Sequence, residues 1–197
     1  PVVPAAGRVG FFCQSGALGI AILADAAARG LGLSSFVSAG NRADVSGNDL
    51  LQFWQTDDRT EVVLLYLESF GNPRKFARLA RVLARSKPVI AVKSGRHALL
   101  PEGLQANVSP ISDAAVASLF AQSGVIRTDT LSQAFDVALL LACQPLPAGD
   151  VVAVIGNSTA LGLLAFDACL DAGLTVAGGA PVDLGASVSP DDMAAAV

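Results

Sequence analysis

Charged side chains are scarce in this sequence: they make up 15% of its 197 residues, and histidine, tryptophan, tyrosine and methionine occur once each. A single histidine excludes a metal site built from several histidines. The three cysteines, Cys13, Cys143 and Cys169, stand on separate apolar stretches without metal-ligand spacing. This placement favours reduced thiols and a cytoplasmic protein, and we expect no metal site.

Long apolar runs are also absent, although 52% of the residues are hydrophobic and the mean hydropathy is +0.55. The longest run extends from Val137 to Cys143, far short of the roughly 20 residues that span a bilayer. No charged-then-apolar leader is visible, so we expect neither a membrane nor secretion. The net charge of -4 argues against nucleic-acid binding. The high apolar content instead fits a parallel sheet covered by helices on both faces.

Apolar strand patterns alternate with helical patterns through the first two thirds of the chain. The strands are predicted at residues 8–13, 34–38, 61–68, 89–95 and 124–127, and the helices between them at 17–29, 49–55, 72–86 and 112–122. Such alternation requires right-handed crossovers and a parallel sheet, so we predict a doubly wound, flavodoxin-like α/β domain.

A second strand-helix-strand pattern begins at residue 151, after a predicted helix at 131–143 and a linker with two prolines and a glycine. We therefore predict a flavodoxin-like domain over residues 1–128 and the start of a second, incomplete α/β unit over 129–197. The boundary is placed near Thr128. The chain begins without Met and stops within a helical pattern, so we expect it to be a fragment.

Polar residues follow four of the predicted strands. They lie at 14–16, 38–44, 68–69 and 93–96. Ligands of open parallel sheets bind beyond the carboxyl ends of the strands, so these residues are expected to share one functional edge.

Gln14, Ser15 and Gly16 open a helix, and this allows two interpretations. Free backbone amides and the helix dipole make such a start a site for phosphate or carboxylate, whereas Ser15 as a simple N-cap contributes about 1 kcal/mol to stability. Glu68 closes an apolar strand, where a carboxylate is either exposed at the edge or buried with a partner. Neither G-x-G-x-x-G nor a P-loop is present.

His97 has no carboxylate or nucleophile at useful spacing, which favours a surface loop histidine. The stretch from Gly40 to Asp44 is open to two readings, a turn kept for its shape or part of the edge site. Asn41 and Asp44 are its weaker site candidates.

Several blocks in order resemble the NDP-forming acyl-CoA synthetases, the superfamily of succinyl-CoA synthetase. They are "GRVGFFCQSGALG", "SSFVSAGNRADVSGNDLLQFWQTDDRT", "VVLLYLESF" and "KPVIAVKSGR", which cover about residues 7–96, followed by "LFAQSGVIR". "VAVIGNSTALGLLAFDACLDAGL" is similar to the start of the next ligase domain.

The resemblance implies acyl-CoA chemistry through a phosphohistidine. Family members interconvert acyl phosphate and CoA with acyl-CoA, and pass the phosphoryl group through histidine to a nucleoside diphosphate. By resemblance, Ser15 and Gly16 cradle that phosphate and Glu68 orients the histidine. The resemblance also implies CoA or acyl-CoA and ATP/ADP as cofactors of the full-length protein, none of them tightly bound to this fragment.

This sequence departs from the family at the histidine itself. The family has a Ser-His-Thr-Gly block where this chain reads "LQANVSP", and a gapless count from Phe120 places Gln105, or a close neighbour, at the histidine position. A glutamine amide cannot accept a transferable phosphoryl group as imidazole does. The CoA-binding and ATP-grasp domains of the family are also not in this sequence, so no catalytic residue is predicted.

Ligase-like regions without the histidine resemble those fused to GNAT-type protein acetyltransferases. The leading hypothesis is therefore a degenerate ligase domain pair that binds acyl-CoA or phosphate, or regulates a larger acetyltransferase-linked protein. One alternative is an active ligase subunit whose phospho-acceptor has moved to His97. Another is a purely structural subunit-contact module, and self-association into a homo-oligomer fits the apolar helices.

Overall fold

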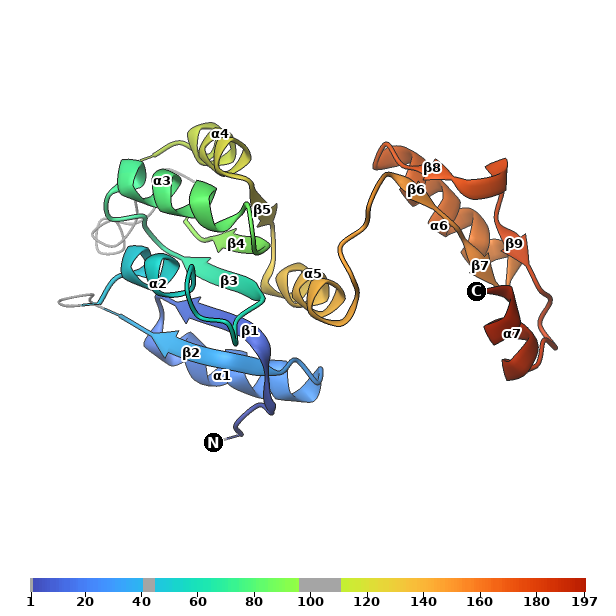
Figure 1. The fold of residues 1–197 in the computed structure, drawn as a ribbon, viewed down its shortest axis with the longest axis horizontal. Coiled ribbons are helices and arrows are strands. Elements are labelled where there is room, and N and C mark those ends of the chain that lie inside the picture. Colours follow the sequence, from blue (N-terminus) through green and yellow to red (C-terminus); the bar gives the residue numbers. More distant parts are fainter. Residues whose placement is uncertain (1, 41–44, 96–110) are drawn as a thin grey trace. The chain divides into compact units, whose positions relative to one another are not determined.

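The computed structural model describes residues 2–40, 45–95 and 111–197. The chain forms two compact units, one ending at Pro145 and one running from Leu146 to Val197 (Figure 1). Each unit is described by itself below.

The first unit is built on a five-stranded parallel sheet with the order β2-β1-β3-β4-β5. Its strands are β1 (Ala6–Cys13), β2 (Leu33–Ser38), β3 (Val62–Leu67), β4 (Val89–Lys93) and β5 (Val125–Thr128). In the central register, Phe11 pairs with Phe36 on one side and with Leu64 on the other. The order confirms the predicted flavodoxin-like sheet, and its topological switch point lies between β1 and β3, where ligands of such sheets bind.

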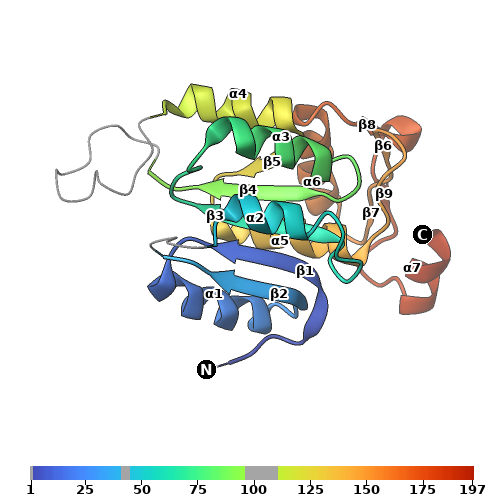
Figure 2. The ribbon, with the colours of Figure 1, turned by 60° about the vertical axis from the view of Figure 1, so that its left-hand side comes forward.

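Helices cover both faces of this sheet, as Figure 2 shows. They are α1 (Gly16–Ala28), α2 (Gly47–Phe53), α3 (Pro73–Leu83), α4 (Asp113–Ser123) and α5 (Leu131–Cys143). Residues of α1 and α5 belong to one core cluster and residues of α2, α3 and α4 to the other. The alternating inward positions of the strands divide between these two clusters, so every central strand is apolar on both faces.

The sequence predicts α2 two residues too late, at Asp49 instead of Gly47. The helix starts early because Asp49 reaches back to its beginning, where its Oδ2 accepts from the Ser46 amide at 3.0 Å. Such a capping box is a start signal in its own right.

The domain boundary predicted near Thr128 does not match the compact units, because α5 packs with the first sheet. Ala134, Phe135 and Ala138 of this helix are fully buried in the cluster that contains Phe11, whose ring meets the Phe135 ring edge-on at 6.0 Å. The first unit therefore extends through Pro145.

The second unit consists of two two-stranded parallel sheets and two helices. Its elements are β6 (Val151–Val152), β7 (Ile155–Gly156), α6 (Thr159–Asp171), β8 (Thr175–Val176), β9 (Val182–Asp183) and α7 (Pro190–Ala196). Strand β6 pairs with β8, and β7 pairs with β9. Val176 is the one buried residue of 146–197, all of which the structure describes.

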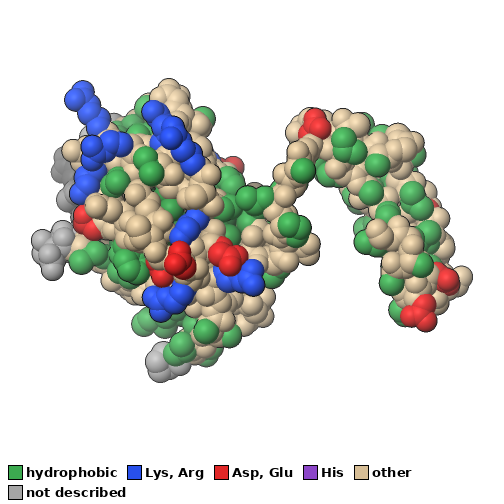
Figure 3. Space-filling view, viewed as in Figure 1, with side chains coloured by type: hydrophobic (Ala, Val, Ile, Leu, Met, Phe, Trp, Pro, Cys, Tyr) green, Lys and Arg blue, Asp and Glu red, His purple; other side chains and the backbone are tan. Residues whose placement is uncertain are grey.

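Charge is distributed unevenly between the two units. The outward face of α3 carries the exposed Arg74, Arg78 and Arg81, and basic side chains gather on this face of the first unit (Figure 3). Residues 146–197 contain aspartates but no lysine or arginine. Among the described residues, no helix has the length and apolarity needed to cross a bilayer.

Candidate functional site

The first turn of α1 presents open backbone donors at the carboxyl edge of the sheet. Ser15 is its N-cap, and its Oγ accepts from the Leu18 amide at 3.3 Å. The first turn contains no acidic residue, and Gly16 and Ala17 are exposed. A Cβ atom built on Gly16 meets nothing within 4 Å. The amides of Gly16 and Ala17 have no acceptor within the helix, so this turn has the properties of an anion site.

The other long helices of the first unit begin differently. Helix α3 starts with Pro73, which has no amide hydrogen, and α4 has Asp113 in its first turn. Helix α5 closes its own start with a capping box, since Gln133 Oε1 accepts from the amides of Asp129 and Thr130 at 2.9 and 3.2 Å. Of these four helices, α1 offers the start best suited to an anion.

Gln14 joins the end of β1 to the end of β3. Its side chain is 4% exposed, and its Oε1 accepts from the amides of Glu68 and Ser69 at 2.7 and 2.9 Å. Its Nε2 donates to the Ser69 carbonyl at 2.8 Å. Sequence reasoning grouped Gln14 with the phosphate ligands, but its side chain is committed to the backbone of the β3 turn. It therefore positions Glu68.

The thiol of Cys13 is hydrogen-bonded to the backbone of Ser15, the N-cap of α1. Its Sγ donates to the Ser15 carbonyl at 3.2 Å and lies 3.4 Å from the Ser15 amide. Burial raises the pKa of this thiol, the hydrogen bond to Ser15 partly offsets that effect, and the nearby Glu68 carboxylate raises the pKa further. Cys13 therefore stays a neutral thiol at neutral pH and places no negative charge beside Ser15.

Lys93 ends β4 and places a cation next to the Glu68 region. It is 4% exposed, and its Nζ donates to the Ser94 carbonyl. Burial lowers the pKa of the Lys93 ammonium, while the charges of Glu68 and Asp113 partly offset this effect. The negative charges of Glu68, at the end of β3, and of Asp113 thus favour the charged form of the Lys93 ammonium.

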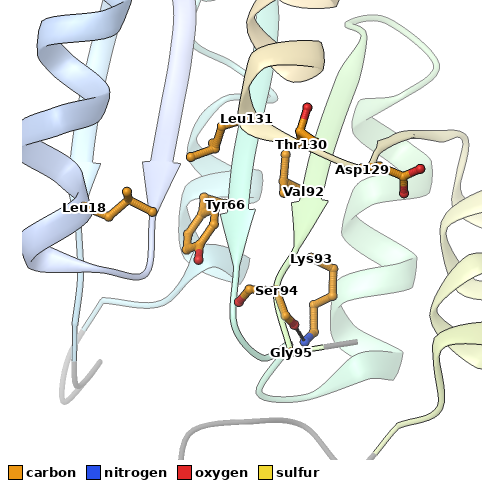
Figure 4. Close-up of a pocket in the computed structure, with 9 residues that line it drawn as sticks. All are labelled: Leu18, Tyr66, Val92, Lys93, Ser94, Gly95, Asp129, Thr130 and Leu131. Carbon is orange, nitrogen blue, oxygen red and sulfur yellow. Dashed lines mark hydrogen bonds between the residues drawn. The ribbon is translucent and has the colours of Figure 1, made fainter. Parts of the chain in front are cut away.

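A pocket of about 440 Å³ opens beside this cluster (Figure 4). It lies beyond the ends of β3 and β4, between the first turns of α1 and α5. Its lining residues are Leu18, Tyr66, Val92, Lys93, Ser94, Gly95, Asp129, Thr130 and Leu131. The site therefore combines an open helix start, the buried Lys93 and an open pocket at the edge predicted from strand topology.

Gln14, which directly precedes Ser15 and Gly16 in the chain, accepts a hydrogen bond from the Glu68 amide. Asn41 and Asp44 lie outside the described residues, as do His97 and Gln105.

The sequence places Lys93 among the polar residues expected at this edge, but it does not indicate Tyr66 or the start of α5. The alternation of side chains along β3 could have indicated Tyr66, because Tyr66 lies on the same face of the strand as Val62 and Leu64. Within the described ranges, no cluster of three or more histidine, cysteine or acidic residues could hold a metal ion.

Residues 6–141 match the family described as "Succinyl-CoA ligase like flavodoxin domain". The alpha subunit of acetate–CoA ligase [ADP-forming] I from Pyrococcus furiosus is 37% identical over 170 residues, which are 85% of this chain and 37% of that subunit. The 4-hydroxybutyrate–CoA ligase [ADP-forming] of Nitrosopumilus maritimus is 36% identical over 183 residues, 89% of this chain and 26% of that enzyme.

A solved structure shares the fold of nearly the whole chain. It is the dinucleotide forming Acetyl-coenzyme A synthetase 1 of Ca. Korarchaeum cryptofilum in complex with phosphate and ADP, with a TM-score of 0.89 and 30% identity over 98% of this chain and 46% of that one. The chain spans less than half the length of each of these relatives. It belongs to the succinyl-CoA ligase-like flavodoxin domain family and is homologous to the alpha subunits of NDP-forming acetyl-CoA synthetases.

Proposed function

We propose that the first unit is the phosphate-binding ligase domain of an NDP-forming acyl-CoA synthetase-like protein. The observation that carries this proposal is the first turn of α1, with exposed Gly16 and Ala17 and with Glu68 held beside it by Gln14. Gly16 and Ala17 bind a phosphoryl oxygen through their backbone amides, Ser15 caps the turn, and Glu68 faces the group that carries or receives the phosphoryl. The phosphate and ADP named for the Korarchaeum relative support this assignment.

The absence of the phosphohistidine is part of this proposal. The gapless count from Phe120 puts Gln105, or a close neighbour, at the family's histidine position, and an amide nitrogen has no lone pair basic enough to take up a phosphoryl group. The domain then binds phosphate, acyl phosphate or acyl-CoA without transferring the phosphoryl group. In this role it serves as a binding or regulatory module of a larger protein that uses CoA and ATP or ADP, with a GNAT-type acetyltransferase as the proposed linked domain.

The second unit is proposed to be a ligase-like α/β domain as well. Residues 158–162 read Ser-Thr-Ala-Leu-Gly and repeat the pattern of residues 15–19, Ser-Gly-Ala-Leu-Gly. Helices α1 and α6 both have 13 residues, and each is followed by a glycine with positive φ, Gly30 and Gly173. The repeat supports a duplicated strand-helix-strand plan.

A second candidate function is an active ligase subunit, favoured by the 37% identity to a protein named an acetate–CoA ligase subunit. In this alternative His97 carries the phosphoryl group. Incubation of the full-length protein with labelled ATP, acetate and CoA separates the two, because acid-labile phosphate on His97 supports the alternative. No labelling in the parent, with labelling restored by Gln105→His, supports the degenerate site.

A thermal-shift titration with phosphate, ADP, ATP, CoA and acetyl-CoA tests the anion site. We expect phosphate to raise the melting temperature of the parent and to have no effect on Ser15→Asp, because the new carboxylate occupies and repels the site. Ser112→Asp is the matched control, since Ser112 caps α4 in the same way and Asp is an equally good N-cap. A flat response of the parent to every ligand would instead favour a structural contact module.

A further inference from the structure

The pocket beside the α1 turn is open to solvent, and the larger part of its lining surface is apolar. Leu18 of α1, Leu131 of α5, Val92 of β4 and the Tyr66 ring form this apolar part (Figure 4). Its volume of about 440 Å³ lies in the range of roughly 300–1,000 Å³ that small-molecule sites occupy. Water in such an apolar space is readily displaced by an apolar ligand group.

Polar groups lie at both ends of the pocket, with Thr130 and Asp129 near Leu131 and Val92 and a larger group at the opposite end. Figure 4 shows the Tyr66 hydroxyl, the Ser94 side chain and the Lys93 ammonium toward one end, with Leu131 and Val92 toward the other. The carboxylate of Asp129 points away from Tyr66 in the same view. This arrangement suits a molecule with an apolar tail and an anionic or hydrogen-bonding head.

Two residues that line the pocket are hydrogen-bonded to residues at the start of α1. Leu18 is the wall residue whose amide donates to Ser15 Oγ at 3.3 Å, and the Tyr66 carbonyl accepts from the Gln14 amide at 3.2 Å. A molecule whose head lies at the start of α1 can therefore extend its tail along Leu18 into the pocket.

We propose that this pocket binds the acyl chain of the substrate, and that the chain is an aliphatic carboxylic acid longer than acetate. The inference rests on the proposed function, because the acid is the group that the phosphate turn would serve. A single methyl group leaves most of a 440 Å³ pocket unfilled, whereas each further methylene buried between Leu18, Val92 and Leu131 adds affinity.

Ligand-observed NMR with the 197-residue chain tests this inference with acetate, butyrate and hexanoate at constant ionic strength. We expect the affinity to rise about fourfold for each methylene added, which corresponds to the transfer free energy of a buried methylene. Equal binding of acetate and hexanoate, or no binding of any acid, would overturn the proposal.

Two variants of α5 locate the binding. Leu131→Trp narrows the pocket and is expected to weaken hexanoate binding at least tenfold, about the effect of losing two methylenes. Leu141→Trp is the matched control, because Leu141 is also half-buried on the same core cluster but does not line the pocket. Equal losses in both variants would contradict the assignment.

Lys93→Met tests the head group. We expect this variant to lose hexanoate binding and to keep binding of hexanol, which has the same tail without a charge. Equal retention of both ligands would remove Lys93 from the proposal.

The phosphate thermal shift, measured on the same variants, separates this inference from the proposed function. A phosphate response without chain-length dependence overturns the acyl pocket alone. Hexanoate binding without a phosphate response overturns the phosphate turn and leaves a carboxylic acid site.

Discussion

Gln14 shows how one buried side chain can fix the geometry of a site. Its amide group makes three hydrogen bonds to the backbone of Glu68 and Ser69, at 2.7 to 2.9 Å. An amide is suited to this task because it donates and accepts at one position. From sequence, the same residue is indistinguishable from a ligand, since its partners lie 54 and 55 residues away.

Gln14→Leu is expected to lower the free energy of unfolding by about 1–3 kcal/mol, because three backbone groups lose their partner in a half-buried turn. It should also abolish the phosphate response through displacement of Glu68. Urea unfolding and the thermal shift measure the two effects. Gln55→Leu is the control, since its side chain makes a single hydrogen bond, at 3.5 Å to the Leu79 carbonyl. A Gln14→Leu protein as stable as the parent would contradict the positioning role.

Lys93 predicts a pH dependence of stability. Burial lowers the pKa of its ammonium in the folded chain, so between that pKa and the ordinary value of about 10.4 the unfolded chain binds more protons at this residue. The contribution of Lys93 to the free energy of unfolding therefore rises with pH across this window and is smallest below it. Urea unfolding of the parent and Lys93→Met from about pH 8 to about pH 10 should show the parent gaining stability relative to the variant. A relative loss would contradict the buried ammonium.

At the scale of elements, the sequence predicts strands and helices well where local pattern and tertiary role agree. The apolar run of β3 and the amphipathic α3 are found as expected, with Phe76, Leu79 and Leu83 in the core. The prediction fails where distant contacts decide. Helix α5 was assigned to the second domain because nothing local reveals that Phe135 packs on Phe11.

The pocket is also formed by contacts between segments that are far apart in the sequence. Leu18, Tyr66 and Leu131 are ordinary apolar core residues in their own segments, and only the pairing of β1, β3 and β4 brings them around one cavity. Ser15 and Glu68 were predictable because both follow strands, and the carboxyl ends of parallel strands meet at one edge.

Alanine substitutions at Gly10 of β1 and Gly16 of α1 are expected to have opposite effects on the free energy of unfolding. A Cβ on Gly10 would lie 2.6 Å from Cε2 of the fully buried Trp54, so Gly10→Ala is expected to cost about 1–3 kcal/mol of stability through overpacking. Gly16→Ala has open space and a helical backbone, so it should be neutral or stabilise by up to about 1 kcal/mol. Denaturant unfolding of both variants measures the contrast, and equal effects would contradict the packing of Trp54 on β1.

In the whole molecule, the two units differ in how many apolar side chains each buries. The first unit contains two extended clusters of fully buried side chains, whereas the second buries Val176 and leaves Leu161, Leu163 and Leu164 of α6 more than half exposed. Stability of the chain therefore resides in the first unit.

Limited proteolysis is expected to cut first after the first unit. Residues 143–151 are exposed, and the segment includes Pro145 and Pro147. Proteinase K followed by mass spectrometry should yield a resistant fragment that contains residues 6–143, and this fragment should keep the phosphate response. Early cleavage within β3 or α5 would contradict the division of the chain at Pro145.

An amide-resolved NMR titration of the 197-residue chain with inorganic phosphate shows whether the backbone amides at the start of α1 bind an anion. We expect saturable shifts of the Gly16 and Ala17 amides, lost in Ser15→Asp and kept in Ser112→Asp. Shifts confined to other helix starts, or none at Gly16 and Ala17 while the chain remains folded, would contradict this expectation.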